Sequence, residues 1–276
     1  MNDAPSTVPP IDFTRYPIDG RDDTARRDIV SKCRQDLSAY QYCSLPVFFN
    51  IDVMEKEAER AKTLLPLANP ANSRRNCYLQ RTGDPSLPDN HPRNIMNPAR
   101  YRMIAADRLP AESALKQMYF WPLFQKFIAE IVDEPVLYPS EDLLQPVNVI
   151  CYGEGDQSAW HYDSTNAFTM TLMLQEAEKG GSFELAANTR NGPEDEDLDY
   201  MLEVLGGNRD RVKTVSRSAG ELTIFRGCNS LHRVSPVKGD RLRMMAVFVY
   251  ESEPGIVGDP EVNMTVYGRT GREAIA

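Results

Sequence analysis

The feature that most limits how this chain can fold is a pair of potential metal ligands in one short extended stretch, with a third ligand far along the chain. His161 and Asp163 are separated by a single residue, and His232 follows much later. Side chains in a strand alternate between its two faces, so His161 and Asp163 point to the same side and can bind one ion together. A fold that uses all three ligands must bring His232 back to that face.

Two histidines and one carboxylate on one side of a metal leave the opposite coordination positions open, as in the non-haem Fe(II) oxygenases. The chain has 3 histidines, and this interpretation uses two of them. The alternative is a chance His-x-Asp pair in which each histidine is an ordinary hydrogen-bonded residue. The remaining histidine, His91, is followed by proline and preceded by Asp89 and Asn90, which is typical of a turn.

The sequence around these ligands predicts short strands separated by turns. Strand-like runs occupy residues 148–153, 168–175, 182–185, 220–225 and 241–251, and glycines at 180, 181 and 227 mark turns between them. About eight short strands with this punctuation indicate a double-sheet jelly roll, so we expect a mainly β fold with flanking helices.

An ordered series of motifs makes this interpretation more specific. The series is Asn-Val-Ile-Cys-Tyr-Gly, His-Tyr-Asp, Gly-Gly-Ser-Phe-Glu, Gly-Glu-Leu-Thr-Ile-Phe, His-Arg-Val-Ser-Pro-Val and Gly-Asp-Arg-Leu-Arg. It resembles the double-stranded β-helix core of the Fe(II)/2-oxoglutarate-dependent dioxygenases, and within them the BesD-like group of free amino-acid halogenases and hydroxylases. The resemblance implies a cupin-like jelly roll with N-terminal helices packed on it. It also implies Fe(II) held by His161, Asp163 and His232, with 2-oxoglutarate and O2 as cosubstrates.

The distal carboxylate of 2-oxoglutarate needs a permanent positive charge, which the planar guanidinium of arginine supplies. Arg241 matches the place where the superfamily carries that residue, and we expect it to be the main anchor. Arg243 is expected on the same strand face as support or as the alternate anchor. Asn148 and Tyr152 share one face of their strand. If this is the inner face, they could bind cosubstrate or substrate. The alternative is that they only form hydrogen bonds with other groups at the mouth of the barrel.

We expect one catalytic domain over residues 1–276, with the jelly-roll core at 140–252 and a C-terminal tail at 253–276. Residues 1–139 should form its helical and loop support, with helices near 22–42, 51–67 and 110–132. Residues 68–101 contain several prolines, which exclude a continuous helix, and are a candidate lid. The acidic run 194–197 should open a helix over 198–205.

Four residues are candidates for substrate binding. Arg74 or Arg75 could hold a substrate carboxylate through two parallel hydrogen bonds. Glu141 or Asp142 could neutralise a substrate ammonium or guanidinium group. For all four, the alternative is a solvated surface residue.

Asp163 occupies the position that is open to chloride in the halogenases of the related group, so the resemblance implies hydroxylation. The expected reaction inserts oxygen into an unactivated C–H bond of a small molecule, with release of succinate and CO2. The expected substrate is a free amino acid, and a basic one is an option. A peptide hydroxylase of the same superfamily and a non-enzymatic jelly-roll binding module are the alternatives.

Composition limits the partners. A formal net charge of -9 disfavours a nucleic-acid ligand, whose phosphates need a basic surface. The sequence has no apolar run long enough to span a bilayer and no N-terminal apolar segment. Its 5 scattered cysteines are typical of reduced thiols. We therefore expect a cytoplasmic protein, monomeric or homodimeric, with no nucleic-acid or membrane partner.

Overall fold

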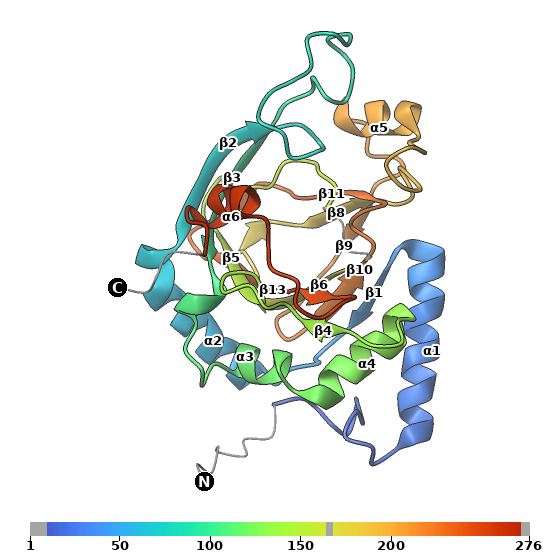
Figure 1. The fold of residues 1–276 in the computed structure, drawn as a ribbon, viewed down its shortest axis with the longest axis vertical. Coiled ribbons are helices and arrows are strands. Elements are labelled where there is room, and N and C mark those ends of the chain that lie inside the picture. The colour runs from blue at the N-terminus through green and yellow to red at the C-terminus, as the bar shows by residue number, and fades with distance from the viewer. Residues whose placement is uncertain (1–9, 164–167, 272–276) are drawn as a thin grey trace.

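The computed structural model describes residues 10–163 and 168–271, and a large antiparallel sheet is its main element (Figure 1). The strand order is β1-β10-β6-β13-β5-β3-β2. The strands are β1 (Tyr42–Leu45), β10 (Leu222–Phe225), β6 (Thr169–Gln175), β13 (Arg243–Phe248), β5 (Val147–Tyr152), β3 (Asn97–Ile104) and β2 (Asn69–Arg75).

A smaller sheet of three strands lies against it, in the order β11-β8-β9. Its strands are β11 (Leu231–Val234), β8 (Phe183–Ala186) and β9 (Lys213–Val215). Two short pairs complete the strands, β7 (Lys179–Gly180) with β12 (Val237–Lys238) and β4 (Tyr138–Pro139) with β14 (Tyr250–Glu251). The predicted jelly-roll core, mainly β with flanking helices, is confirmed.

Helices from the N-terminal half pack on one face of the large sheet. They are α1 (Asp23–Tyr40), α2 (Ile51–Leu64), α3 (Ala114–Tyr119) and α4 (Pro122–Val132), with 3-10 turns at Leu65–Leu67 and Ala106–Arg108. The predicted helix over 110–132 is two helices, because Pro122 has no N–H to continue α3 and instead fits the first turn of α4. Asp22 caps the start of α1, and its carboxylate accepts from the amides of Thr24 and Ala25.

The alternation of side chains along the central strands separates two environments. On β5, Val147, Val149 and Cys151 belong to the apolar core shared with the helices. Ile150 and Tyr152 belong to a separate cluster on the opposite face, which looks toward the smaller sheet. The inner face predicted for Tyr152 is therefore present.

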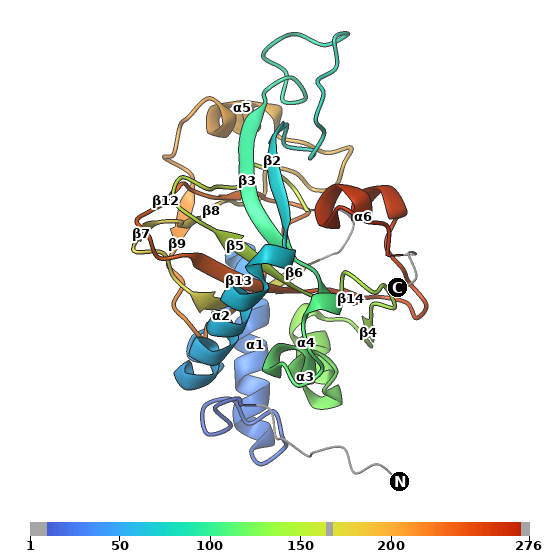
Figure 2. The ribbon, with the colours of Figure 1, turned by 90° about the vertical axis from the view of Figure 1, so that its left-hand side faces the viewer.

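Residues 68–101, the candidate lid, contain no continuous helix, as predicted, but both ends of this range form strands that the sequence did not predict. β2 and β3 pair from Asn69 with Met103 to Arg75 with Asn97, and Figure 2 shows them as a long ribbon. Their prolines exclude a helix but are tolerated at the edge of a sheet, where β2 lies. Only residues 76–96 form the expected loop.

Two further helices lie after the core strands begin. α5 (Leu198–Leu205) has the predicted bounds, and the carboxylate of Asp197 accepts from the amide of Tyr200 at its start. α6 (Pro260–Tyr267) lies in the predicted tail and contacts β2 and β3. None of the helices in the described part of the chain is long and apolar enough to cross a membrane.

Candidate metal centre and active site

His161, Asp163 and His232 converge on one point between the sheets. The Nε2 atoms of His161 and His232 lie 3.6 Å and 3.4 Å from the same carboxylate oxygen, Oδ1 of Asp163. The three ligand atoms all lie within 4.8 Å of one another. The expectation that the fold returns His232 to the face of the His-x-Asp pair is confirmed.

Hydrogen bonds and close contacts hold the Asp163 carboxylate in place. Asp163 donates its amide N–H to the carbonyl of Gly227 at 3.1 Å. A Cβ at position 227 would lie 2.0 Å from Oδ2 of Asp163, so only glycine allows this approach. The hydroxyl of Thr169 donates to the same Oδ2, which leaves Oδ1 facing the imidazoles.

Backbone carbonyls orient both imidazole rings. Nδ1 of His161 lies 2.8 Å from the carbonyl oxygen of Ala159, and Nδ1 of His232 lies 3.0 Å from that of Ser230. A carbonyl can only accept, so each Nδ1 carries the proton and each Nε2 presents its lone pair to the shared point. Two imidazoles and one carboxylate in this geometry fit Fe(II).

Protonation states also suit a metal. Burial, reinforced by the neighbouring His232, lowers the pKa of His161 to about 4, so its ring is neutral at neutral pH. Burial alone would raise the pKa of Asp163, but the two imidazoles and the Thr169 hydroxyl outweigh it and hold that pKa below its usual value. Neutral imidazole and ionised carboxylate are the forms that bind metal ions.

Two cavities adjoin these ligands. The larger, of about 560 Å³, touches Asp163. Its lining is mainly apolar and comes from the loop before β3, the start of β6, β13 and α6, with Leu79, Phe168, Val247, Val262 and Val266. The smaller, of about 70 Å³, touches His161 and is lined by Ile150 and Tyr152. Arg75 lines both cavities, so it lies where a substrate near the metal would be held.

The two candidate arginines of β2 point to opposite sides. Arg75 is 4% exposed and donates from Nε to the Ser73 hydroxyl at 3.2 Å. No carboxylate of the described residues forms an ion pair with it. Arg74 is exposed and donates to the carbonyl of Met96. The geometry therefore selects Arg75 as the candidate for substrate binding.

Neither Glu141 nor Asp142 lines the two cavities beside the metal ligands. Glu141 is exposed. The buried carboxylate of Asp142 accepts from the amides of Leu144, Gln145 and Gly258 and from Nδ2 of Asn263. Asp142 thus ties α6 to the segment before β5, and the prediction that it binds substrate is wrong.

Arg241 is also misplaced in the prediction. It is exposed and donates from Nη2 to the carbonyl of Ala177 at 3.1 Å. Regular β13 begins only at Arg243, so the strand alternation that was expected to turn Arg241 inward does not reach it. Arg243 is 1% exposed, and of the two arginines it alone lies in the interior.

Asn148 and Tyr152 differ in where they lie. Tyr152 lines the small cavity beside His161, as expected for a residue of the site. Asn148 is buried and donates from Nδ2 to the carbonyl of Gln145 at 2.7 Å. It lines neither cavity beside the metal ligands, so its contacts point to a structural role.

A buried arginine that the sequence did not single out accompanies Arg243. Arg217 is 8% exposed and donates from Nη1 to the hydroxyl of Thr171 at 2.9 Å. It lies between β9 and β10, outside every strand-like run, and only the packing of the two sheets brings it inward.

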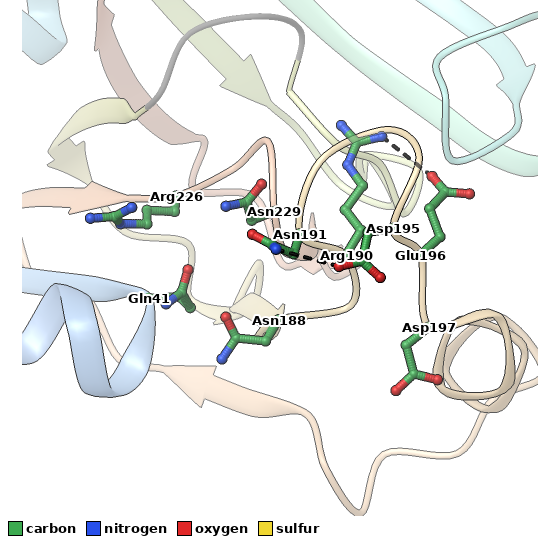
Figure 3. Close-up of a pocket in the computed structure, with 9 residues that line it drawn as sticks. All are labelled: Gln41, Asn188, Arg190, Asn191, Asp195, Glu196, Asp197, Arg226 and Asn229. Atoms are coloured by element: carbon green, nitrogen blue, oxygen red, sulfur yellow. Dashed lines mark hydrogen bonds and ion pairs between the residues drawn. The ribbon is translucent and has the colours of Figure 1, made fainter.

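A separate polar pocket is lined by residues of the 188–197 segment together with Arg226 and Asn229 (Figure 3). There Arg190 points toward Glu196, donates to the carbonyl of Cys228 at 2.5 Å and stacks on the ring of Tyr162. Glu196 also accepts from the hydroxyl of Tyr78 at 2.6 Å. The acidic run therefore supports the residues that flank the metal ligands, besides starting α5.

Comparisons with solved structures show the class of fold. An oxidoreductase of the 2OG-Fe(II) oxygenase family from Burkholderia pseudomallei is 14% identical, with a TM-score of 0.51, covering 81% of this chain and 91% of that one. The non-heme alpha ketoglutarate dependent epimerase SnoN from nogalamycin biosynthesis is 13% identical, with a TM-score of 0.56 and coverages of 85% and 93%. AviO1 from Streptomyces viridochromogenes Tue57 is 15% identical, with a TM-score of 0.56 and coverages of 83% and 97%. The chain has the fold of the Fe(II)/2-oxoglutarate oxygenases.

A family model identifies the family to which the chain belongs. Residues 25–263 match the model of the Halogenase D family, and the chain belongs to that family. No curated protein matches it. The expected cofactors, Fe(II) with 2-oxoglutarate and O2, fit this fold and the His161, Asp163 and His232 donor set.

Proposed function

We propose that this protein is an Fe(II)/2-oxoglutarate-dependent hydroxylase of a small molecule, and that it acts on a free amino acid. The observation that carries the proposal is the position of Asp163. Its Oδ1 lies 3.6 Å and 3.4 Å from the Nε2 atoms of His161 and His232, so all three atoms can bind one metal ion. The carboxylate then supplies the third ligand, which halogenases of the related group lack. With that position filled, no coordination site is left for chloride.

Bound Fe(II), 2-oxoglutarate and O2 would supply the oxidising power, with release of succinate and CO2. The chain's own contribution is to hold and orient. His161, Asp163 and His232 would bind the metal from one side, and Arg243 would hold the distal carboxylate of the cosubstrate. The inner face of the sheet would exclude water from the reacting atoms.

Arg75 and the larger cavity support a carboxylate-bearing substrate with an apolar body. Arg75 is buried beside the metal ligands without an acidic partner among the described residues, so its charge is available to a substrate carboxylate. The described acids that line the larger cavity are Asp163, which is a proposed metal ligand, and the exposed Glu261. This lining favours an amino acid with an apolar side chain over a basic one.

A turnover screen tests the proposal. Purified protein with Fe(II), ascorbate and 2-oxoglutarate is offered a panel of amino acids, and succinate is measured together with products by mass spectrometry. We expect at least one member with an apolar side chain to give succinate above background and a product heavier by one oxygen atom. No succinate above background with any member of the panel would refute the proposal.

We also propose a cytoplasmic location without nucleic-acid or membrane partners. The net charge of -9 supports the absence of a nucleic-acid partner, because such a partner would require a basic surface.

A further inference from the structure

Arg217 and Arg243 lie next to each other in the interior between the two sheets. They are 8% and 1% exposed. Both reach the sulfur atom of Met245, from Nη1 of Arg217 at 3.2 Å and from Nη2 of Arg243 at 3.8 Å. Two guanidinium groups therefore flank a single side chain.

Their other described contacts are neutral. Arg243 donates from Nε to the carbonyl of Gly181 at 2.7 Å, and Arg217 donates to the Thr171 hydroxyl. The Cζ atom of Arg217 lies 3.9 Å from the centre of the Phe183 ring. None of the ion pairs among the described residues includes either arginine. Glu221 acts on Arg217 through its charge, and Glu176 lines the same cavity, but neither acid forms an ion pair with Arg217 or Arg243.

Part of each guanidinium has no hydrogen-bond partner within the described residues. The buried nitrogen atoms without one are Nε and Nη2 of Arg217 and Nη1 of Arg243. Burial, followed by the charge of Arg243, lowers the pKa of Arg217 to about 9, so the group still carries its charge at neutral pH. Buried charges and donors of this kind are costly unless something pairs with them.

A cavity of about 150 Å³ is lined by both arginines together with Gly181, Ser182 and Phe183. Aromatic side chains separate this cavity from the metal ligands. The Phe183 ring centre is 5.7 Å from that of His232, and Tyr152, which lines the cavity beside His161, has its ring centre 5.4 Å from Cζ of Arg243.

We propose that Arg217 is a second guanidinium that, together with Arg243, binds the distal carboxylate of the 2-oxo diacid cosubstrate. This inference rests on the proposed function and extends it to a residue that no sequence motif marks. A carboxylate has two oxygens that each accept more than one hydrogen bond, so it can pair with unpartnered donors from both arginines. Arg217 acts as a positioning residue, because it would fix the end of the cosubstrate that does not react.

Equilibrium binding tests this role without turnover. The Kd of 2-oxoglutarate and of pyruvate, which has the same keto acid end but no distal carboxylate, is measured anaerobically by calorimetry on Fe(II)-loaded protein. In Arg217→Met we expect the Kd of 2-oxoglutarate to rise on the order of 10- to 100-fold, the usual effect of losing a charged hydrogen-bonding partner. The Kd of pyruvate should stay within about twofold, since the lost charge faces only the distal carboxylate.

Two further variants complete the design. Arg217→Lys keeps a charge of similar reach and should recover part of the 2-oxoglutarate affinity, and it also provides a folded variant should Arg217→Met not fold. Arg241→Met removes an exposed arginine and should bind both acids like the wild type. Methionine keeps most of the apolar stem and removes a buried charge, so the Tm of the metal-free Arg217→Met protein should not fall.

Unchanged 2-oxoglutarate affinity in folded Arg217 variants would overturn the inference, and so would an equal loss of affinity for both acids. Wild-type protein that binds no 2-oxoglutarate would instead refute the proposed function itself, so the two failures are distinguishable.

Discussion

His161 and His232 face each other across an antiparallel β-bridge. Each donates its backbone N–H to the carbonyl of the other, at 3.0 Å and 3.1 Å, and their ring centres are 4.2 Å apart. A slip of one residue in this pairing would turn one imidazole to the opposite face of its strand. Strand pairing therefore places the two imidazoles side by side, and the Ala159 and Ser230 carbonyls then fix the orientation of the rings.

Asp163→Gly tests the third ligand. Because the metal would keep only two protein ligands, we expect the oxygenated product to disappear, as measured by mass spectrometry with and without added chloride. A chlorinated product in the presence of chloride would show that the vacated position accepts a halide. Unchanged hydroxylation would remove Asp163 from the ligand set.

Gly227→Ala tests the close approach behind that ligand. The new Cβ would lie 2.0 Å from Oδ2 and 2.7 Å from Cγ of Asp163, so the carboxylate must move. We expect weaker Fe(II) binding by about 10- to 100-fold, as for loss of other groups that orient metal ligands. At Gly153 the nearest atom to an added Cβ is 3.6 Å away, so Gly153→Ala is the control and should bind Fe(II) normally.

Neighbouring arginines provide a matched pair for substrate recognition. Arg75→Met should raise the KM of the amino-acid substrate by about 10- to 100-fold, because its carboxylate loses a charge-assisted partner. Arg74→Met removes the same charge from the exposed face of β2 and should leave the KM unchanged. Steady-state kinetics with the best substrate of the screen measures both, and equal effects would contradict the role of Arg75.

Asp142→Ala tests stability. The buried carboxylate accepts four hydrogen bonds, three of them from backbone amides, and their donors would be left without partners. We expect the free energy of unfolding in urea to fall by about 2–4 kcal/mol. Glu141→Ala, at the exposed neighbouring position, should change it by less than about 0.5 kcal/mol. A small effect at Asp142 would show that the C-terminal segment is held by other contacts.

The pair His161 and Asp163 could be predicted from the sequence because its placement is local. The alternation of a strand puts His161 and Asp163 on one side, and the resemblance supplied His232 as their partner. The helix over 198–205 was predictable for the same reason, since its acidic start and glycine stop are adjacent in sequence. β2 and β3 were not predicted, because prolines that exclude a continuous helix also interrupt a strand pattern. An edge strand such as β2 tolerates them, and Pro98 lies in the part of β3 that pairs with β2 alone.

Two arginines could not be assigned from the sequence: Arg241 was chosen over Arg243, and Arg217 was not singled out. Both assignments depend on contacts between residues that are far apart in the sequence. Whether Arg241 or Arg243 points inward depends on the residue at which β13 begins, and strand ends are set by pairing with β5 and β6. Arg217 is far in sequence from Thr171 and Phe183, its contacts in the fold. Only the packing of one sheet on the other brings these residues together.

The most direct test is anaerobic titration of the protein with Fe(II) and 2-oxoglutarate, followed by visible absorption. The wild-type protein should develop a weak charge-transfer band that is absent in His161→Ala and in His232→Ala. His91→Ala should keep the band, because His91 belongs to a turn in which its Nδ1 accepts from the amide of Arg93. A band of normal intensity in the His161 and His232 variants would contradict a shared iron site.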